Sequence, residues 1–194
     1  SLPAATLSIR EGLTAGMQES LVSGRLDVAL LYNATPSPDI DLQPLLEEEL
    51  FLISPIHGAA HAASLPEAVA VHDLPAFPLI VPSRPNAIRM LIESELANLG
   101  LRPTIAFEVD GVGAILDLVG EGFGHAILSR NAVTNLGSGQ TLQIRPIAAP
   151  GLHAKLALAV NSHRQITATQ QALIELLRLV VGEQLLTAPP PAHS

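Results

Sequence analysis

The sequence predicts an α/β fold, and three observations lead to that prediction. Apolar runs of strand length alternate with segments in which apolar residues recur every three or four positions, as on one face of a helix. Glycines follow the predicted helices, where they can end them. Hydrophobic residues make up 48% of the 194 residues and aromatic residues only 3%, so the chain can form a core and that core must be aliphatic.

The N-terminal part is predicted to run strand, helix, strand. Residues 6–9 form a short β-branched and apolar run, and a helical stripe of apolar residues follows over 13–23. Gly24 is a suitable helix stop, and the apolar run over 26–31 is typical of a strand that is buried on both faces. Residues 42–55 contain further strand material.

A second α/β unit is predicted from residue 78 onward. It has strands over 78–81, 104–109 and 125–128, and a helix over 88–99. Asp110 is predicted to cap the helix between the last two strands by accepting N–H bonds from its first turn. This alternation predicts a mostly parallel sheet that is covered on both faces.

The C-terminal part is predicted to contain one more strand and a long helix. The strand covers 153–160, the helix covers 165–186, and a proline-rich tail over 188–194 is expected to be disordered.

Charge and composition exclude several functions for this chain. The net charge is −8, and the ten basic residues, nine of them arginine, form no run. A basic surface for a phosphate backbone is therefore absent, and any DNA binding must come from a segment outside this chain. The chain has no cysteine, opens with no signal peptide and contains no apolar run of membrane-spanning length, so we expect a cytoplasmic location.

The candidate chemical groups favour binding over catalysis. Ser138 lies between glycines without the strand–turn–helix context of a hydrolase nucleophile, and His57 and His61 make an incomplete zinc site next to a proline and a glycine. The glycine-rich stretch 120–124 lies after a helix, so a tight turn is favoured over a phosphate loop. His125 is interpreted as a buried, hydrogen-bonded imidazole. We expect no catalytic residues, no metal and no cofactor.

The best anion sites predicted from the residues are helix N-termini that follow strands. They lie at Thr14, at 83–86 and at 110–113, where free N–H groups point beyond the carboxyl ends of the strands. The Ser83-Arg84 turn favours an anion because it combines a hydroxyl, a guanidinium and backbone donors. The alternative is that Ser83 caps the helix and Arg84 is solvated, and the residues alone leave both interpretations open.

A series of soft motifs in a fixed order, between Pro3 and Leu186, resembles the effector-binding domain of LysR-type transcriptional regulators. The motifs are Glu11-Gly12 with Thr14, Gly24-Arg25-Leu26-Asp27, Phe51-Leu52-Ile53-Ser54, Asp73-Leu74 before Pro78-Leu79-Ile80, Gly100-Leu101-Arg102-Pro103, and Gly122-Phe123-Gly124.

The resemblance implies two Rossmann-like lobes joined by two crossover strands, similar to the type 2 periplasmic binding proteins. Lobe 1 would contain 1–56 and 155–187, and lobe 2 would contain 57–154, with crossovers near 52–56 and 153–161. In the family, a helix-turn-helix domain and a first strand and helix of the effector domain precede the part that matches this chain. Lobe 1 is therefore expected to be incomplete at its N-terminus.

The resemblance also implies a function. A small-molecule inducer would bind between the lobes, shift their angle and the oligomer geometry, and so control DNA binding by the absent helix-turn-helix domain. By position, the effector contacts would be Thr14, Asn33, Pro82, Ser83, Arg84, Val109 and Asp110. Arg84 makes a small carboxylate or another anion a reasonable effector. The chain would form a homodimer or homotetramer through 13–23 and 86–99.

Two other classes of protein stay open at this point. A solute-binding protein of a transport system shares the two-lobe fold and would carry an export signal in place of a DNA-binding domain. An α/β enzyme ranks third, because the sequence offers no nucleophile or metal constellation.

Overall fold

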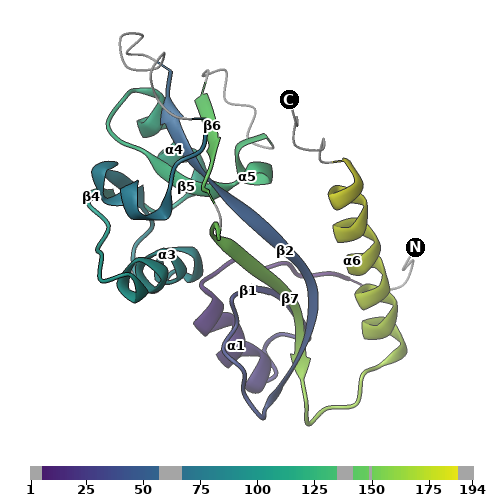
Figure 1. Ribbon diagram of the computed structural model, residues 1–194. Helices are drawn as coiled ribbons and strands as arrows, with labels where there is room; N and C mark the ends of the chain where they lie inside the picture. Colours follow the sequence, from purple (N-terminus) through teal and green to yellow (C-terminus); the bar gives the residue numbers. More distant parts are fainter. Residues whose placement is uncertain (1–5, 57–66, 135–141, 149, 188–194) are drawn as a thin grey trace. The chain divides into compact units, whose positions relative to one another are not determined.

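The computed structural model describes residues 6–56, 67–134, 142–148 and 150–187 (Figure 1). The chain divides into two compact units: unit 1 combines Ser1–Leu46 with Lys155–Ser194, and unit 2 is Glu47–Ala154. Two strands, β2 (Ile40–Pro55) and β7 (His153–Asn161), have residues in both units. The predictions of an α/β fold and of two strands shared by the lobes are therefore confirmed. The lobe boundaries expected from the resemblance stay a prediction.

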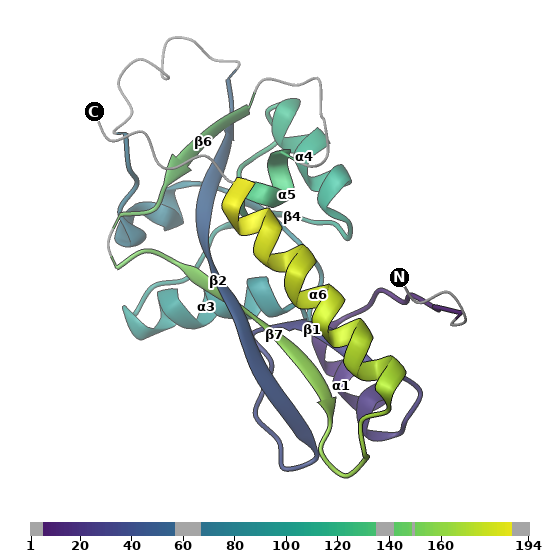
Figure 2. The same cartoon turned by 90° about the vertical axis from the view of Figure 1, so that its right-hand side faces the viewer.

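Unit 1 is a sheet with a helix on each face. Besides its parts of β2 and β7 it contains α1 (Thr14–Val22), β1 (Val28–Tyr32) and α6 (Ala168–Thr187). β1 pairs antiparallel with β7. Successive residues of β7 point to opposite faces, so Ala159 joins the cluster with Leu21 of α1, while Leu158 and Val160 join the cluster with Ile174 of α6. Figure 1 shows the two helices on opposite sides of β1 and β7, and α6 faces the viewer in Figure 2.

The predicted strand over 6–9 is wrong. Residues 6–13 carry no strand, and the side chain of Ile9 is 87% exposed. The physical reason is the absence of a partner: β1 is the edge of the described sheet, and its one hydrogen-bonded neighbour is β7. Four residues without a ladder leave their N–H and C=O groups to water, so the segment stays irregular.

Unit 2 consists of short strands and helices around the second half of β2. Its elements are η1 (Val71–Ala76), β3 (Leu79–Val81), α3 (Ala87–Asn98), β4 (Ile105–Glu108), α4 (Val112–Gly120), β5 (Ala126–Ser129), α5 (Arg130–Thr134) and β6 (Leu142–Pro146). The α3 and α4 helices, β4 and β5 lie where the sequence predicted them, within a few residues.

Parallel pairing is found among the three strands that predicted it, but the strands of unit 2 as a whole are mixed in direction. β3 and β4 pair parallel, and Leu79 forms a parallel bridge with His125, but β2 pairs antiparallel with both β5 and β6. Helical crossovers connect β3 to β4 and β4 to β5, and such crossovers are what parallel neighbours require. The α5 helix and the stretch up to residue 141 lie between β5 and β6, and each of these two strands runs opposite to β2.

The core of unit 2 lies between β2, β3, β5 and α4. Its buried members are Phe51, Ile53, Ile80, Ile115, Leu116, Val119, Ala126 and Val133. The glycine-rich stretch 120–124 ends α4 as a tight turn, in agreement with the sequence interpretation. At Gly124 a Cβ atom would lie 2.8 Å from the carbonyl oxygen of Pro78, so only glycine lets β5 approach the start of β3.

We expect Leu116→Ala to lower the free energy of unfolding by about 2–5 kcal/mol, because a fully buried leucine leaves a cavity when it is truncated. Val112→Ala, at an exposed position of the same helix, is the matched control and is expected to change it by less than about 0.5 kcal/mol. Denaturant unfolding of both variants measures the difference, and equal losses would contradict the described core.

Candidate functional site

In unit 1, the predicted contacts Thr14 and Asn33 lie next to each other at the end of β1. The Thr14 hydroxyl donates a hydrogen bond to the carbonyl oxygen of Tyr32 (3.2 Å). Asn33 has a positive φ of 45° and is tied to β7 twice: its N–H donates to the carbonyl oxygen of Lys155 (2.8 Å), and its Oδ1 accepts from the Lys155 N–H (2.9 Å). Asparagine tolerates this backbone conformation better than most residues.

Two sets of hydrogen-bond donors remain free at this place. The side-chain Nδ2 of Asn33 is buried and has no hydrogen-bond partner. The N-terminus of α1 has no side-chain cap, because its N-cap residue is Leu13. Buried donors without partners cost free energy, and the N-terminus of a helix attracts negative charge. This end of unit 1 is therefore suited to an acceptor atom of a ligand.

In unit 2, the five predicted contacts lie at the ends of β3 and β4. The N–H of Val109 donates to the carbonyl oxygen of Val81 (2.9 Å), which holds the two strand ends together. Asp110 does not cap α4, contrary to the sequence prediction. The N-cap of α4 is Gly111 with a φ of 99°, so Asp110 lies one residue too early, and its Oδ1 instead accepts from the Ser83 N–H (2.9 Å).

Arg84 has a carboxylate partner. Its Nη2 lies 2.7 Å from Oε2 of Glu93, although the arginine side chain is 62% exposed. Burial raises the pKa of Glu93, but hydrogen bonds from Arg84 and Arg89 outweigh burial and bring the pKa below its usual value. The guanidinium expected to receive an anion is thus already paired with one of the chain's own.

The alternative role for Ser83, as the helix cap, is also wrong. Asn86 caps α3, because its Oδ1 accepts from the N–H groups of Ile88 (3.0 Å) and Arg89 (3.1 Å). An asparagine directly before a helical apolar stripe is a known N-cap signal, so the sequence could have revealed it. With this cap in place, two first-turn donors of α3 are occupied.

Arg89, which sequence reasoning missed, organises this turn. It is 5% exposed and fully partnered: Nε donates to Glu93 Oε1 (2.9 Å), Nη1 to the carbonyl oxygen of Pro82 (2.9 Å) and Nη2 to Glu108 Oε1 (2.8 Å). The hydrogen bond from Arg89 lowers the pKa of Glu108. One guanidinium therefore joins α3 to the ends of β3 and β4.

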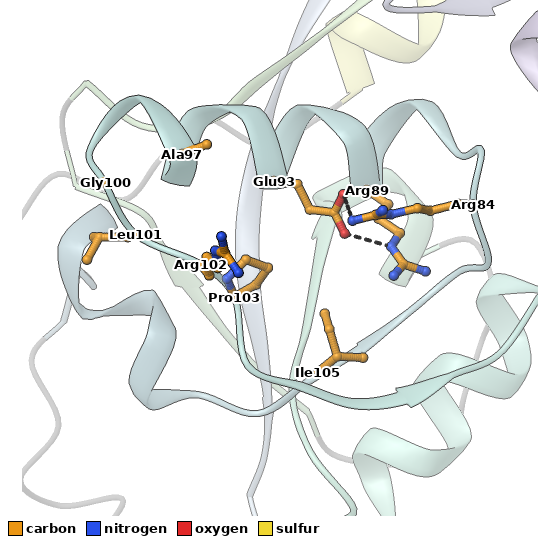
Figure 3. Close-up of a pocket in the computed structure, with 9 residues that line it drawn as sticks. All are labelled: Arg84, Arg89, Glu93, Ala97, Gly100, Leu101, Arg102, Pro103 and Ile105. Carbon is orange, nitrogen blue, oxygen red and sulfur yellow. Dashed lines mark hydrogen bonds and ion pairs between the residues drawn. The ribbon is translucent and has the colours of Figure 1, made fainter.

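A groove of about 570 Å³ runs along α3 beside this network (Figure 3). It is lined by Arg84, Arg89, Glu93, Ala97, Gly100, Leu101, Arg102, Pro103 and Ile105. Figure 3 shows Arg84 and Arg89 on Glu93, and Arg102 projecting toward α3 from the segment that follows the helix. Of the predicted contacts, only Arg84 lines this groove.

His125 is hydrogen-bonded and half-buried, as the sequence interpretation held. Its Nδ1 lies 2.9 Å from the Ser54 hydroxyl, and its ring meets that of Phe77 edge-on at 5.1 Å. Burial lowers the pKa of His125 below its usual value, and the charge of Arg145 lowers it further.

The structure does not test the other chemical candidates. His57, His61 and Ser138 lie outside the described residues. Within the described ranges, no group of three or more His, Cys, Asp or Glu side chains could hold a metal ion. In the same part of the chain, no helix combines the length and apolar character needed to cross a bilayer.

Comparison with known proteins identifies the family. Residues 1–181 match the model of the LysR substrate binding domain, so the chain belongs to that family. It is 24% identical over 184 residues to the nitrogen assimilation regulatory protein nac of Escherichia coli K12, covering 95% of this chain and 58% of the relative. The chain therefore spans little more than half the length of that regulator.

Solved structures show the same fold. The effector binding domain of QuiR in complex with shikimate superposes with a TM-score of 0.73 and 20% identity, over 89% of this chain and 79% of the other. The regulatory domain of CcmR from Synechocystis PCC6803, in complex with 2-PG, superposes with a TM-score of 0.79 and 16% identity, over 92% and 85%. The two-lobe fold class expected from the resemblance is thereby confirmed.

We expect Arg89→Met to lower the free energy of unfolding by about 1–3 kcal/mol, because it leaves the Pro82 carbonyl and Glu93 without their buried donor. Arg84→Met removes an exposed ion pair with the same glutamate and is expected to cost less than about 1 kcal/mol. Denaturant unfolding compares the two variants. Equal costs would show that Arg89 does not organise the turn.

We expect stability to fall as the pH drops below about 6.5, because His125 in the unfolded chain takes up a proton before the folded protein does. The contribution of His125 to the free energy of unfolding is fully present above the pKa of this histidine in the unfolded chain. It is lost as the pH falls through the lower pKa of His125 in the folded protein. Denaturant unfolding between pH 5 and 8 measures this slope. His125→Asn should flatten this slope, and a slope that persists unchanged in this variant would contradict the role of His125.

Proposed function

We propose that this chain is the ligand-sensing domain of a LysR-type transcriptional regulator of the cytoplasm. The observation that carries the proposal is the set of free donors at Asn33 and the start of α1, in a domain whose family match spans residues 1–181. Two structural neighbours, QuiR and CcmR, are domains in complex with shikimate and 2-PG. Sensing of a small molecule without turnover fits these observations.

The effector contacts that we assign are those expected from the sequence. In unit 1 they are Thr14 and Asn33, where the Asn33 Nδ2 and the uncapped α1 N-terminus would donate to an acceptor of the ligand. In unit 2 they are Pro82, Ser83, Arg84, Val109 and Asp110. A small carboxylate or another anion is the effector class that these donors favour.

The internal pairs of unit 2 sharpen this assignment. Asp110 already accepts from the Ser83 N–H, and Glu93 already pairs with Arg84. An anionic effector would have to share or replace these partners, whereas the unit 1 donors are free. We therefore assign the stronger anion contacts to Asn33 and the α1 N-terminus, and a weaker one to Arg84.

The mechanism that we propose is a population shift. The effector would favour one arrangement of the domain over another through its differential affinity for them, and the change would reach DNA-binding segments outside this chain. A homodimer or homotetramer would transmit it through 13–23 and 86–99. Exposed apolar side chains at Leu13, Val22 and Met90 on and beside these helices support this role.

Calorimetric titration with a panel of aromatic and aliphatic carboxylates tests the effector class. Asn33→Asp keeps the Oδ1 that accepts from Lys155 and exchanges the free Nδ2 donor for a negatively charged oxygen, so carboxylate affinity is expected to fall about tenfold or more, through loss of the donor and charge repulsion, while the fold is kept. Arg84→Ala is expected to weaken binding less, and Arg102→Ala, an exposed arginine of the same charge, serves as the control.

Three results would contradict parts of the assignment. Unchanged affinity in Asn33→Asp would remove Asn33 from the site, and unchanged affinity in Arg84→Ala would remove the guanidinium. Binding of neutral compounds alone would overturn the anionic class while leaving the sensing role in place.

A further inference from the structure

Arg145 is a buried cation with incomplete hydrogen bonding. It lies on β6 opposite Leu52 of β2 and is 2% exposed. Its Nη2 donates to the Ser54 hydroxyl (2.9 Å), and its guanidinium lies 5.1 Å from the ring centre of Phe77. The Nε and Nη1 atoms are buried and have no hydrogen-bond partner.

Unit 2 offers no carboxylate to this arginine. None of its described Asp and Glu side chains pairs with Arg145, and the undescribed stretches of the unit, 57–66, 135–141 and 149, contain no Asp or Glu in the sequence. Arg89 is buried to a similar degree and has two carboxylates and a carbonyl oxygen. The two arginines differ in partners, so the exception at Arg145 calls for a partner from outside the chain.

The chemistry around Arg145 is suited to a small negative ion. The Ser54 hydroxyl, itself 2% exposed, lies between Arg145 and His125, and no acidic side chain among the described residues is paired with any of the three. Phe77 covers the guanidinium, so a ligand must approach in its plane, at the edges where Nε and Nη1 point. The enclosure of Arg145 and Ser54 excludes large ligands.

This cluster is separate from the effector contacts assigned above. Phe77 precedes β3, and His125 precedes β5 and forms a parallel bridge with Leu79 at the start of β3. The effector contacts Pro82 and Val109 follow the opposite, carboxyl ends of β3 and β4. The cluster therefore lies at the amino ends of the parallel strands, opposite the effector contacts.

We propose that Arg145, with Ser54 and His125, forms a binding site for a small anion inside unit 2, of the size of a halide or a small oxyanion such as nitrate. The bound ion accepts hydrogen bonds from the free nitrogens of Arg145 and neutralises its buried charge. The site joins β6, β2 and the start of β5, so the ion stabilises the fold of this unit and acts independently of the effector.

Unfolding of the full 194-residue chain at constant ionic strength, with sodium gluconate replaced stepwise by sodium chloride or nitrate, tests the proposal. We expect saturable stabilisation, with the unfolding equilibrium constant about tenfold lower when the small anion reaches ten times its dissociation constant. Arg145→Met should abolish this response. Arg130→Met should keep the response and is a matched control, because Arg130 also stacks on a phenylalanine but lies outside the proposed site. Its guanidinium is 4.6 Å from the Phe51 ring centre.

A response that does not saturate, or one that persists in Arg145→Met, would overturn the proposal. If Arg145→Met does not fold, crystals of the unsubstituted chain soaked in bromide give an independent answer. An anomalous peak within hydrogen-bond distance of Arg145 Nε or Nη1 supports the site. Peaks confined to the surface, with only water at Arg145, would contradict it.

Discussion

The alternation of side chains along β2 is the constraint on which unit 2 depends. Phe51 and Ile53 enter the apolar core with α4, while Leu52 and Ser54 point to the other face, where Ser54 receives a hydrogen bond from Arg145. A shift of one residue in the pairing with β5 and β6 would exchange these two sets and bury Ser54 in the core. The register of one strand therefore determines both the hydrophobic core and the placement of the buried polar cluster.

Hydrogen bonds also hold the strand ends in place. The carbonyl oxygen of Tyr32 accepts from the Thr14 hydroxyl, that of Val81 from the Val109 N–H, and that of Pro82 from the Arg89 guanidinium. Each bond fixes the exit of a strand before the following helix begins. The polar groups left over, above all the Nδ2 of Asn33, are then the ones that can serve a ligand.

Sequence patterns correctly predicted the helices and turns that depend on residues close together in the chain. The α1 stripe, the α3 helix and the glycine turn after α4 follow from residues a few positions apart. The failures involve partners that are distant in the chain: the strand at 6–9 lacked a neighbour, and Asp110 bonded to Ser83, 27 residues away, once Gly111 had taken the cap position. Arg145 gave no local signal, because its environment is built by residues 54, 77 and 125. Thr14, Ser83, Arg84 and Asp110 were indicated by helix N-termini as well as by the family resemblance, whereas Asn33, Pro82 and Val109 came from the resemblance alone.

The carboxylates of Asp110 and Glu93 act as built-in competitors for anions at the turn after β3. They accept from the Ser83 N–H and pair with Nη2 of the Arg84 guanidinium, two of the donors that the sequence offered to an anion. An external anion that uses these donors must share them with a tethered competitor or displace it, and where it displaces the carboxylate only the difference between the two interactions contributes to its affinity. Such a turn selects ligands by shape and by the number of oxygens they present, because an anion that displaces these carboxylates exchanges one negative charge for another.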